Sequence, residues 1–210
     1  KMMSDVIPFY GAADPELFEI ERRCMDRDGV LLDDLDGSLP SGCVLDVGAG
    51  NRFTAAWLTA ATRRVVACKP SDGMVTPSVP LPWIQGSAQY LSLSEDSADV
   101  AYATWAYFFP QWQNIQDGLD ELHRVVRPGG SVLIVGNAGN DAFCGLSERD
   151  LASDAAWWET RGFSRTVVNS AYRFNDFGEA RRLFDFYWSF NGRPEGTELT
   201  LKIGFDIAIY

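Results

Sequence analysis

Histidine and cysteine, the side chains that transition metals prefer, are scarce in this chain of 210 residues. It contains one histidine and four cysteines. The cysteines are far apart in the sequence, and none belongs to a CxxC pair of the kind that zinc sites use. A disulfide framework would also require a denser and more regular set of cysteines. We therefore predict no metal site and no disulfide framework, and we expect the thiols to be reduced.

Positive charge is also in short supply. The 18 lysines and arginines are outnumbered by 29 aspartates and glutamates, which gives a formal net charge of −11. Such a negative field repels phosphate backbones and anionic lipid surfaces. We therefore expect no nucleic-acid partner.

Long hydrophobic runs are absent as well. Charged residues, glycine or proline interrupt every apolar segment before it reaches the roughly 18 residues that cross a bilayer. No apolar stretch of the signal-peptide kind follows Lys1, Met2 and Met3. We expect no membrane span and a cytoplasmic location.

The remaining composition is that of an ordinary globular protein. Hydrophobic residues make up 46% of the chain, charged residues 22% and aromatic residues 13%, which argues against a disordered or low-complexity chain. The length matches one domain, and no repeat or Pro/Ser-rich linker divides the sequence. We predict a single domain over residues 1–210.

Short apolar runs alternate with helix-period segments from about residue 14 onward, which is the pattern of an α/β fold. The first helix is expected to start at Pro15, with Asp14 as its N-cap. The expected helices cover residues 15–25, 54–63, 115–126, 151–161 and 176–189. The expected strands cover residues 43–47, 64–68, 83–85, 99–104, 131–135, 165–174 and 199–210. Because ligands of such folds bind beyond the carboxyl ends of the strands, the functional residues are expected at 46–52, 68–74, 85–91 and 104–112.

Four segments carry a resemblance to a known family. They are residues 44–50 (VLDVGAG), 69–74 (KPSDGM), 86–91 (GSAQYL) and 121–130 (ELHRVVRPGG). In this order and spacing they resemble the class I S-adenosylmethionine-dependent methyltransferases, most closely the small-molecule, UbiE-like (type 11) branch. The resemblance covers about residues 40–140.

The resemblance implies an α/β, Rossmann-like fold, with a seven-stranded, mostly parallel, doubly wound sheet and an antiparallel last strand. It implies a helical cap over residues 1–40, a cofactor-binding core over 41–140 and a C-terminal helix–strand–helix–strand completion over 141–210. It further implies an enzyme that uses S-adenosylmethionine to methylate a small molecule. It implies nothing about the oligomeric state.

The resemblance also implies where the cofactor binds. Asp46 would bind its amino-acid end, while Gly48 and Gly50 would let the ligand approach main-chain amides at a helix N-terminus. The implied cofactor-binding residues are Asp46, Gly48, Ala49, Gly50, Lys69, Pro70, Met74, Ser87, Ala88, Thr104 and Trp105. The expected substrate-binding residues are Tyr10 and Tyr107. No catalytic residue is assigned, because methyl transfer from a sulfonium depends mainly on alignment.

Three positions depart from the family's pattern. Arg52 stands in place of a third glycine, and Lys69 in place of the acid that accepts hydrogen bonds from the ribose hydroxyls. An ammonium has donors and no acceptor, so we predict that these two cations weaken cofactor affinity by about ten- to a hundredfold. Ser87 replaces an aspartate but keeps acceptor lone pairs, which is a milder change. If Arg52 points to solvent and Lys69 extends over the sheet edge, the pocket still works.

Two other functions stay open. The altered residues at positions 52 and 69 also fit a non-catalytic methyltransferase-like protein that binds a partner. Lys69 further fits an NADP-dependent oxidoreductase, because a basic residue after the second strand favours a 2′-phosphate. The glycine spacing argues against this oxidoreductase. Phe53 stands where the dinucleotide fingerprint has its third glycine, and the sequence contains no Tyr-x-x-x-Lys pair.

Overall fold

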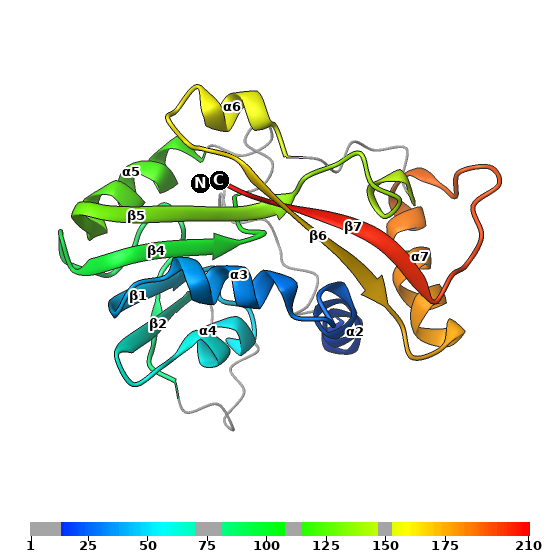
Figure 1. Cartoon of the computed structure of the whole chain (residues 1–210), viewed down its shortest axis with the longest axis horizontal. Helices are drawn as coiled ribbons and strands as arrows, with labels where there is room; N and C mark the ends of the chain where they lie inside the picture. Colours follow the sequence, from blue (N-terminus) through cyan, green and yellow to red (C-terminus); the bar gives the residue numbers. More distant parts are fainter. Residues whose placement is uncertain (1–13, 70–80, 108–114, 147–152) are drawn as a thin grey trace, which may run out of the picture. The chain divides into compact units, whose positions relative to one another are not determined.

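The computed structural model describes residues 14–69, 81–107, 115–146 and 153–210, which form alternating helices and strands (Figure 1). The strands are β1 (Gly42–Val47), β2 (Arg63–Lys69), β3 (Trp83–Gln85), β4 (Ala98–Thr104), β5 (Val126–Asn137), β6 (Thr166–Arg173) and β7 (Lys202–Ile209). The helices are α2 (Pro15–Met25), α3 (Val30–Ser38), α4 (Phe53–Leu58), α5 (Gln116–Val125), α6 (Ala155–Glu159), α7 (Phe177–Asn191) and the short 3₁₀ helix η2 (Cys144–Leu146). None of the helices in the described part of the chain has the length and apolar character that crossing a bilayer requires.

The strands form a seven-stranded sheet in the order β3-β2-β1-β4-β5-β7-β6. The pairs β1–β2, β1–β4, β2–β3 and β4–β5 are parallel. The last strand, β7, pairs antiparallel with β6. The predicted fold class is therefore confirmed: a mostly parallel α/β sheet that ends in an antiparallel strand.

Contacts within the chain divide it into two compact units. Unit 1 contains Leu32–Val135 and Tyr210, while unit 2 contains Gly136–Ile209 and the segment that ends at Leu31. The single domain over residues 1–210, with its three segments, stays a prediction.

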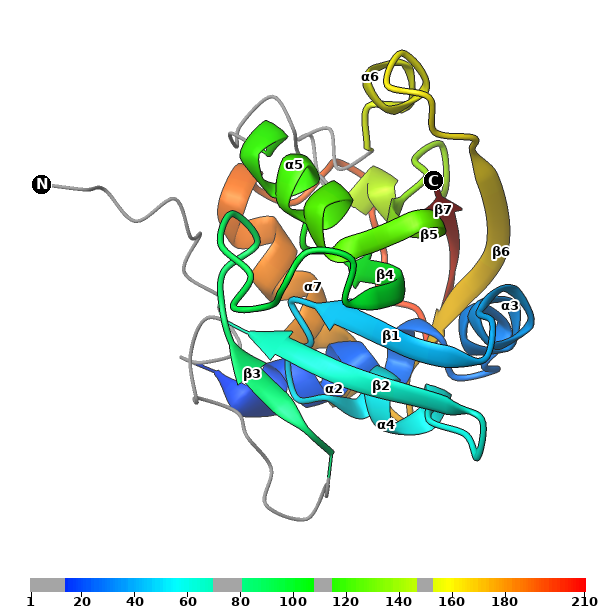
Figure 2. The ribbon, with the colours of Figure 1, turned by 90° about the vertical axis from the view of Figure 1, so that its left-hand side faces the viewer.

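Unit 1 carries the parallel strands, which lie side by side in Figure 2. The chain leaves β1 toward β2 on one side, and it later returns to place β4 on the other side of β1. This reversal of direction is the switch point at which ligands of open α/β sheets bind. Four of the six residues of β1 are buried, so the strand holds the residues that follow it in a fixed position.

Unit 2 is held together by α2, α7 and the β6–β7 pair. α2 begins as predicted, with Asp14 accepting a hydrogen bond from the Leu17 amide at 3.0 Å and proline at the first helical position. The α2 residue Arg23 pairs with Glu179 of α7 at 2.6 Å. The rings of Phe143 and Tyr172 stack with their centroids 4.1 Å apart in the core of the unit.

Three details of the sequence prediction require correction. The helix predicted over 54–63 ends at Leu58, because Ala60 and Arg63 form a bridge that starts β2. Arg63 is itself buried and donates to the carbonyl of Leu39 at 2.7 Å. β5 begins at Val126 and includes residues 128–130, which were expected to separate helix from strand. α3 was not predicted as a separate helix, since its sequence VLLDDLDGS contains three aspartates and a glycine, which have low helix propensity.

Candidate functional site

The loop after β1 is a sharp turn that only small residues permit. Gly48 has φ +78° and Gly50 has φ +49°, both in the region that side-chain-bearing residues rarely adopt. A Cβ atom on Gly48 would lie 2.8 Å from the Cβ of Ala106, so the loops after β1 and β4 touch here. The amides of Gly48 and Ala49 donate to the carbonyl of Cys68 at 2.9 and 3.2 Å. The turn is therefore fixed against the ends of both neighbouring strands.

Asp46 is a carboxyl group buried within the sheet. Its side chain is 1% exposed, and its Oδ2 accepts a hydrogen bond from the hydroxyl of Tyr102 at 2.8 Å. Burial raises the pKa of Asp46 to about 7, although the hydrogen bond from Tyr102 acts in the opposite direction. Among the residues that the structure describes, the other oxygen, Oδ1, has no hydrogen-bond partner. Asp46 thus holds a buried acceptor oxygen for which no described residue supplies a donor.

Tyr102 is a neighbour of Asp46 that the sequence analysis missed. It is the register partner of Asp46 across β1 and β4 and is completely buried. Its pKa is raised well above the usual value, first by burial and then by the charge of Asp46. The sequence does contain one signal for this contact, because Tyr102 stands in the apolar run of β4 and a buried tyrosine hydroxyl requires a hydrogen-bond partner.

Lys69 ends β2 and turns toward the loop after β1. Its side chain is 4% exposed, and its Nζ donates to the carbonyl of Gly50 at 3.2 Å. The ammonium also lies 6.0 Å from the ring centroid of Trp83 in β3, at the outer limit of a cation–π contact. Lys69 therefore does not extend over the sheet edge but joins β2 to the glycine loop.

Arg52 is also buried, at 2% exposure, and does not point to solvent. Its backbone adopts φ +67° at the N-cap of α4, a position where the family's glycine would have no strain. Its Nη1 donates to the carbonyl of Leu81, just before β3, at 3.0 Å. Arg52 and Lys69 thus place two cations within the structure around the glycine loop.

The chain after β3 forms a tight turn over residues 87–90. Ser87 and Tyr90 exchange two backbone hydrogen bonds of 3.1 Å each. The hydroxyl of Tyr107 donates to the carbonyl of Ala88 at 3.3 Å. Ser87 and Ala88 are half-buried, whereas Tyr107 is completely buried, which favours a packing role for Tyr107 rather than contact with a substrate.

Two further predicted cofactor-binding residues lie at the end of β4. Thr104 and Trp105 are half-buried, and Trp105 adopts φ +52° while its amide donates to the carbonyl of Val135 at 2.8 Å. The predicted residues Tyr10, Pro70 and Met74 lie outside the described residues. The others come from the ends of β1, β2, β3 and β4, at one edge of the parallel strands. In the described ranges, no group of three histidine, cysteine or carboxylate side chains is placed to hold a metal ion.

Comparison with known proteins finds a family that resembles part of the chain. Residues 45–134 match the model of the methyltransferase domain family Methyltransf_11. This part of the chain is therefore similar to a methyltransferase domain. The ubiquinone/menaquinone biosynthesis C-methyltransferase UbiE of Rubrivivax gelatinosus is 33% identical to this chain over 95 residues. That match covers 43% of this chain and 37% of the relative, so the chain spans little more than a third of the relative's length.

Solved structures share the fold of this chain. A SAM-dependent methyltransferase from Thermotoga maritima has a TM-score of 0.59 and 16% sequence identity, with 95% of this chain and 97% of that chain covered. The YcgJ protein of Bacillus subtilis has a TM-score of 0.56 and 14% identity, with 85% and 96% covered. The fold thus extends over nearly the whole chain, beyond the residues that the family model matches.

Proposed function

We propose that the chain transfers the methyl group of S-adenosylmethionine to a small molecule, and that Lys69 and Arg52 weaken its hold on this cofactor. The observation that carries the proposal is the buried carboxyl of Asp46 beside the glycine loop. One of its oxygens is held by Tyr102, and the other has no hydrogen-bond partner among the described residues. A buried acceptor of this kind fits the ammonium at the amino-acid end of the cofactor.

The fit is weaker at the ribose. A ribose hydroxyl both donates and accepts hydrogen bonds, but the ammonium of Lys69 can only donate. Lys69 already donates to the Gly50 carbonyl at 3.2 Å, so a ribose in this position competes with an existing contact. The cofactor also carries one more positive than negative charge, and two buried cations oppose it. The residues therefore fit the cofactor with reduced affinity.

When bound, S-adenosylmethionine supplies a methyl group on a sulfonium whose departure as a neutral thioether needs no acid. The residues of this chain therefore act mainly by alignment. Asp46 would hold the ammonium, the glycine loop would support the centre of the cofactor, and the half-buried Ser87 would face the adenine. Trp105, half-buried at the end of β4, would contact the cofactor, and its indole could also face an apolar or aromatic acceptor.

Calorimetry with S-adenosylmethionine and with its demethylated product, S-adenosylhomocysteine, tests the cofactor assignment. We expect measurable binding of both ligands, with dissociation constants weaker than low micromolar. Asp46→Ala should abolish binding of both, because it removes the acceptor for their shared ammonium. Low-micromolar binding to the unaltered chain would contradict the weakened site, and absence of binding at millimolar ligand would contradict the cofactor itself.

A non-catalytic methyltransferase-like protein is the second candidate, favoured by the contact between Lys69 and Gly50. The two candidates differ in whether methyl groups move. The purified protein is incubated with methyl-labelled cofactor and a metabolite extract, and the label is followed in the small-molecule fraction. Labelled product supports the enzyme. A fraction without label, together with cofactor binding restored in Lys69→Glu, supports the binding protein.

A further inference from the structure

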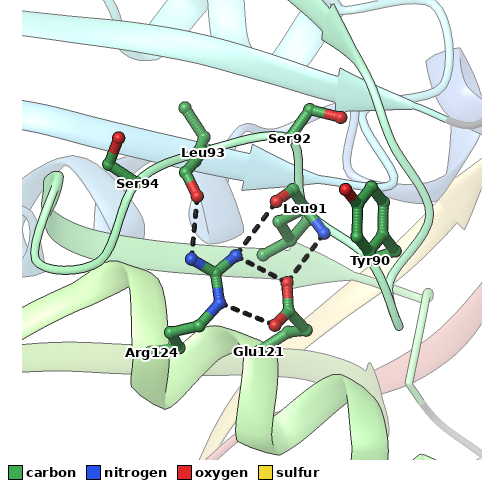
Figure 3. Close-up of a pocket in the computed structure, with 7 residues that line it drawn as sticks. All are labelled: Tyr90, Leu91, Ser92, Leu93, Ser94, Glu121 and Arg124. Atoms are coloured by element: carbon green, nitrogen blue, oxygen red, sulfur yellow. Dashed lines mark hydrogen bonds and ion pairs between the residues drawn. The ribbon is translucent and has the colours of Figure 1, made fainter.

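Two charged side chains of α5 form hydrogen bonds with the backbone that follows β3 (Figure 3). The Oε2 of Glu121 accepts a hydrogen bond from the Leu91 amide at 2.9 Å. Arg124, one helical turn further on, donates from Nη2 to the Leu91 carbonyl at 3.0 Å and from Nη1 to the Leu93 carbonyl at 2.8 Å. Both backbone groups of Leu91 are thus bonded to side chains of one helix.

The two charged groups also hold each other. The Nε of Arg124 lies 2.7 Å from Oε1 of Glu121, and its Nη2 lies 2.7 Å from Oε2. Such a two-pronged pair fixes the direction of both side chains. The hydrogen bond from Arg124 lowers the pKa of the Glu121 carboxyl, which keeps the pair charged at neutral pH. We call this pair and its three bonds to the backbone of Leu91 and Leu93 the α5 clasp.

The α5 clasp borders a shallow hollow of about 360 Å³, lined by Tyr90, Leu91, Ser92, Leu93, Ser94, Glu121 and Arg124. The charged groups of the hollow are engaged with the chain itself. Glu121 binds Leu91 and Arg124, while Arg124 binds two carbonyls and the carboxylate. The two charged side chains of the hollow therefore already have partners within the protein, and they hold the loop rather than a ligand.

The loop that the α5 clasp holds continues directly from the turn over residues 87–90. The start of this turn is fixed by backbone, since the Gly86 amide donates to the Lys69 carbonyl at 3.0 Å. Its middle is held through Ala88, whose carbonyl accepts from Tyr107. Its end passes into Leu91, which is 1% exposed and bonded by the α5 clasp. A shift of Leu91 would therefore move the turn and the Ser87 hydroxyl with it.

A glycine lets α5 come close enough to act in this way. A Cβ atom on Gly118 would lie 2.7 Å from Cε1 of Tyr107 and 3.3 Å from the carbonyl oxygen of Ala88. Gly118 and Glu121 are three residues apart, which places them on the same side of the helix. One side of α5 thus contacts both the middle of the turn and the residue that follows it.

We propose that Glu121 and Arg124 are positioning residues that set the purine-binding turn over residues 87–90 and so determine selectivity for adenine. This proposal rests on the proposed function, because it requires that Ser87 and Ala88 face the adenine of the cofactor. The two charged residues touch no ligand themselves. They act through the backbone of Leu91.

The test compares Arg124→Met and Glu121→Gln with Arg127→Met. The control removes an ion pair of the same 2.7 Å length, between Arg127 and Asp99, from the same unit. Hydrogen exchange reports on the amides of residues 87–93, and calorimetry compares S-adenosylhomocysteine with S-inosylhomocysteine, in which an oxygen replaces the adenine amino group. In Arg124→Met and Glu121→Gln we expect faster exchange over 87–93, with β1 and β4 unchanged. We also expect the preference for adenine over hypoxanthine to fall by about tenfold.

A variant that was merely destabilised would lose affinity for both purines equally. Equal loss for both, or unchanged exchange over residues 87–93, would overturn the proposal, and so would a matching loss of preference in Arg127→Met. Failure of the proposed function gives a different result, because the unaltered chain would then bind neither nucleoside ligand.

Discussion

The ammonium of Lys69 donates to the carbonyl of Gly50 at 3.2 Å and joins the end of β2 to the loop after β1. Both elements border the place where the ribose of a class I methyltransferase cofactor is expected. A buried lysine in this position adds a positive charge near a cationic ligand, and it lacks an acceptor for the ribose hydroxyls. The positive charge at position 69 should therefore lower the affinity for the charged cofactor more than the affinity for its neutral product.

Lys69→Glu should raise the affinity for S-adenosylmethionine by about ten- to a hundredfold. The gain for S-adenosylhomocysteine should be smaller, because that ligand lacks the sulfonium charge. Lys69→Met, which removes the cation without adding an acceptor, should lie between the unaltered chain and Lys69→Glu. Calorimetry with both ligands measures these differences.

Lys202→Glu provides the matched control, since it makes the same charge change at an exposed position of β7. It should leave both affinities unchanged. If Lys202→Glu raises cofactor affinity as much as Lys69→Glu does, the effect comes from overall charge and the role given to Lys69 is wrong.

Asp46 should make the stability of the protein depend on pH. Its pKa is about 7 in the folded chain, above the ordinary value of 3.8. A carboxyl with a raised folded-state pKa stabilises the fold most below its ordinary pKa, and this contribution is lost as the pH rises through about 7. Asp46→Asn removes the titration while keeping the shape of the side chain and an acceptor for Tyr102.

We expect Asp46→Asn to be more stable than the unaltered chain at about pH 8, where the buried carboxylate is ionised. The difference should shrink toward about pH 4. Urea unfolding at several pH values measures it, with Asp117→Asn, an exposed residue of α5, as the control. A stability difference that stays constant with pH would show that Asp46 does not titrate in this range.

The sequence was sufficient to predict the strand–turn–helix unit around Asp46, because Gly48 and Gly50 follow an apolar strand directly. The alternation of apolar runs and helical segments was also sufficient to predict the α/β sheet, while its antiparallel last strand was implied by the family resemblance. The sequence did not predict that Tyr102 is the partner of Asp46, because that contact depends on the register of β4 against β1. The burial of Arg52 was equally out of reach, since its acceptor, the Leu81 carbonyl, is 29 positions away in the sequence.

Glu121 and Arg124 illustrate the same limit. Both belong to a segment that was used only to support the family resemblance. Their spacing of three residues predicts contact between the two side chains on a helix. Their bonds to the backbone of Leu91 join residues about 30 positions apart, and local sequence patterns carry no information on such contacts.

Gly48 should tolerate no side chain. Its backbone has φ +78°, and a Cβ atom added to it would lie only 2.8 Å from the Cβ of Ala106. Gly29 has nearly the same backbone conformation, φ +74°, but open space around the Cβ position. Gly29→Ala therefore measures the backbone strain alone, of about 1–2 kcal/mol. Gly48→Ala should lower the free energy of unfolding by a further 1–3 kcal/mol, approximately, from overpacking. Equal losses in the two variants, measured by urea unfolding, would show that the contact with Ala106 is not tight.

Variants of Tyr107 should show whether this residue packs in the core or binds the substrate. Its side chain is completely buried and its hydroxyl donates to the Ala88 carbonyl at 3.3 Å. Tyr107→Ala should lower the free energy of unfolding by about 3–5 kcal/mol, and Tyr107→Phe, which loses one hydrogen bond, by about 1 kcal/mol. Thermal and urea unfolding measure both.

A Tyr107→Ala variant that keeps its melting temperature but loses turnover would instead place Tyr107 in the acceptor pocket, as the sequence predicted. The Phe variant then distinguishes the ring from the hydroxyl, because an acceptor held by ring contact alone would be methylated at the same rate in Tyr107→Phe.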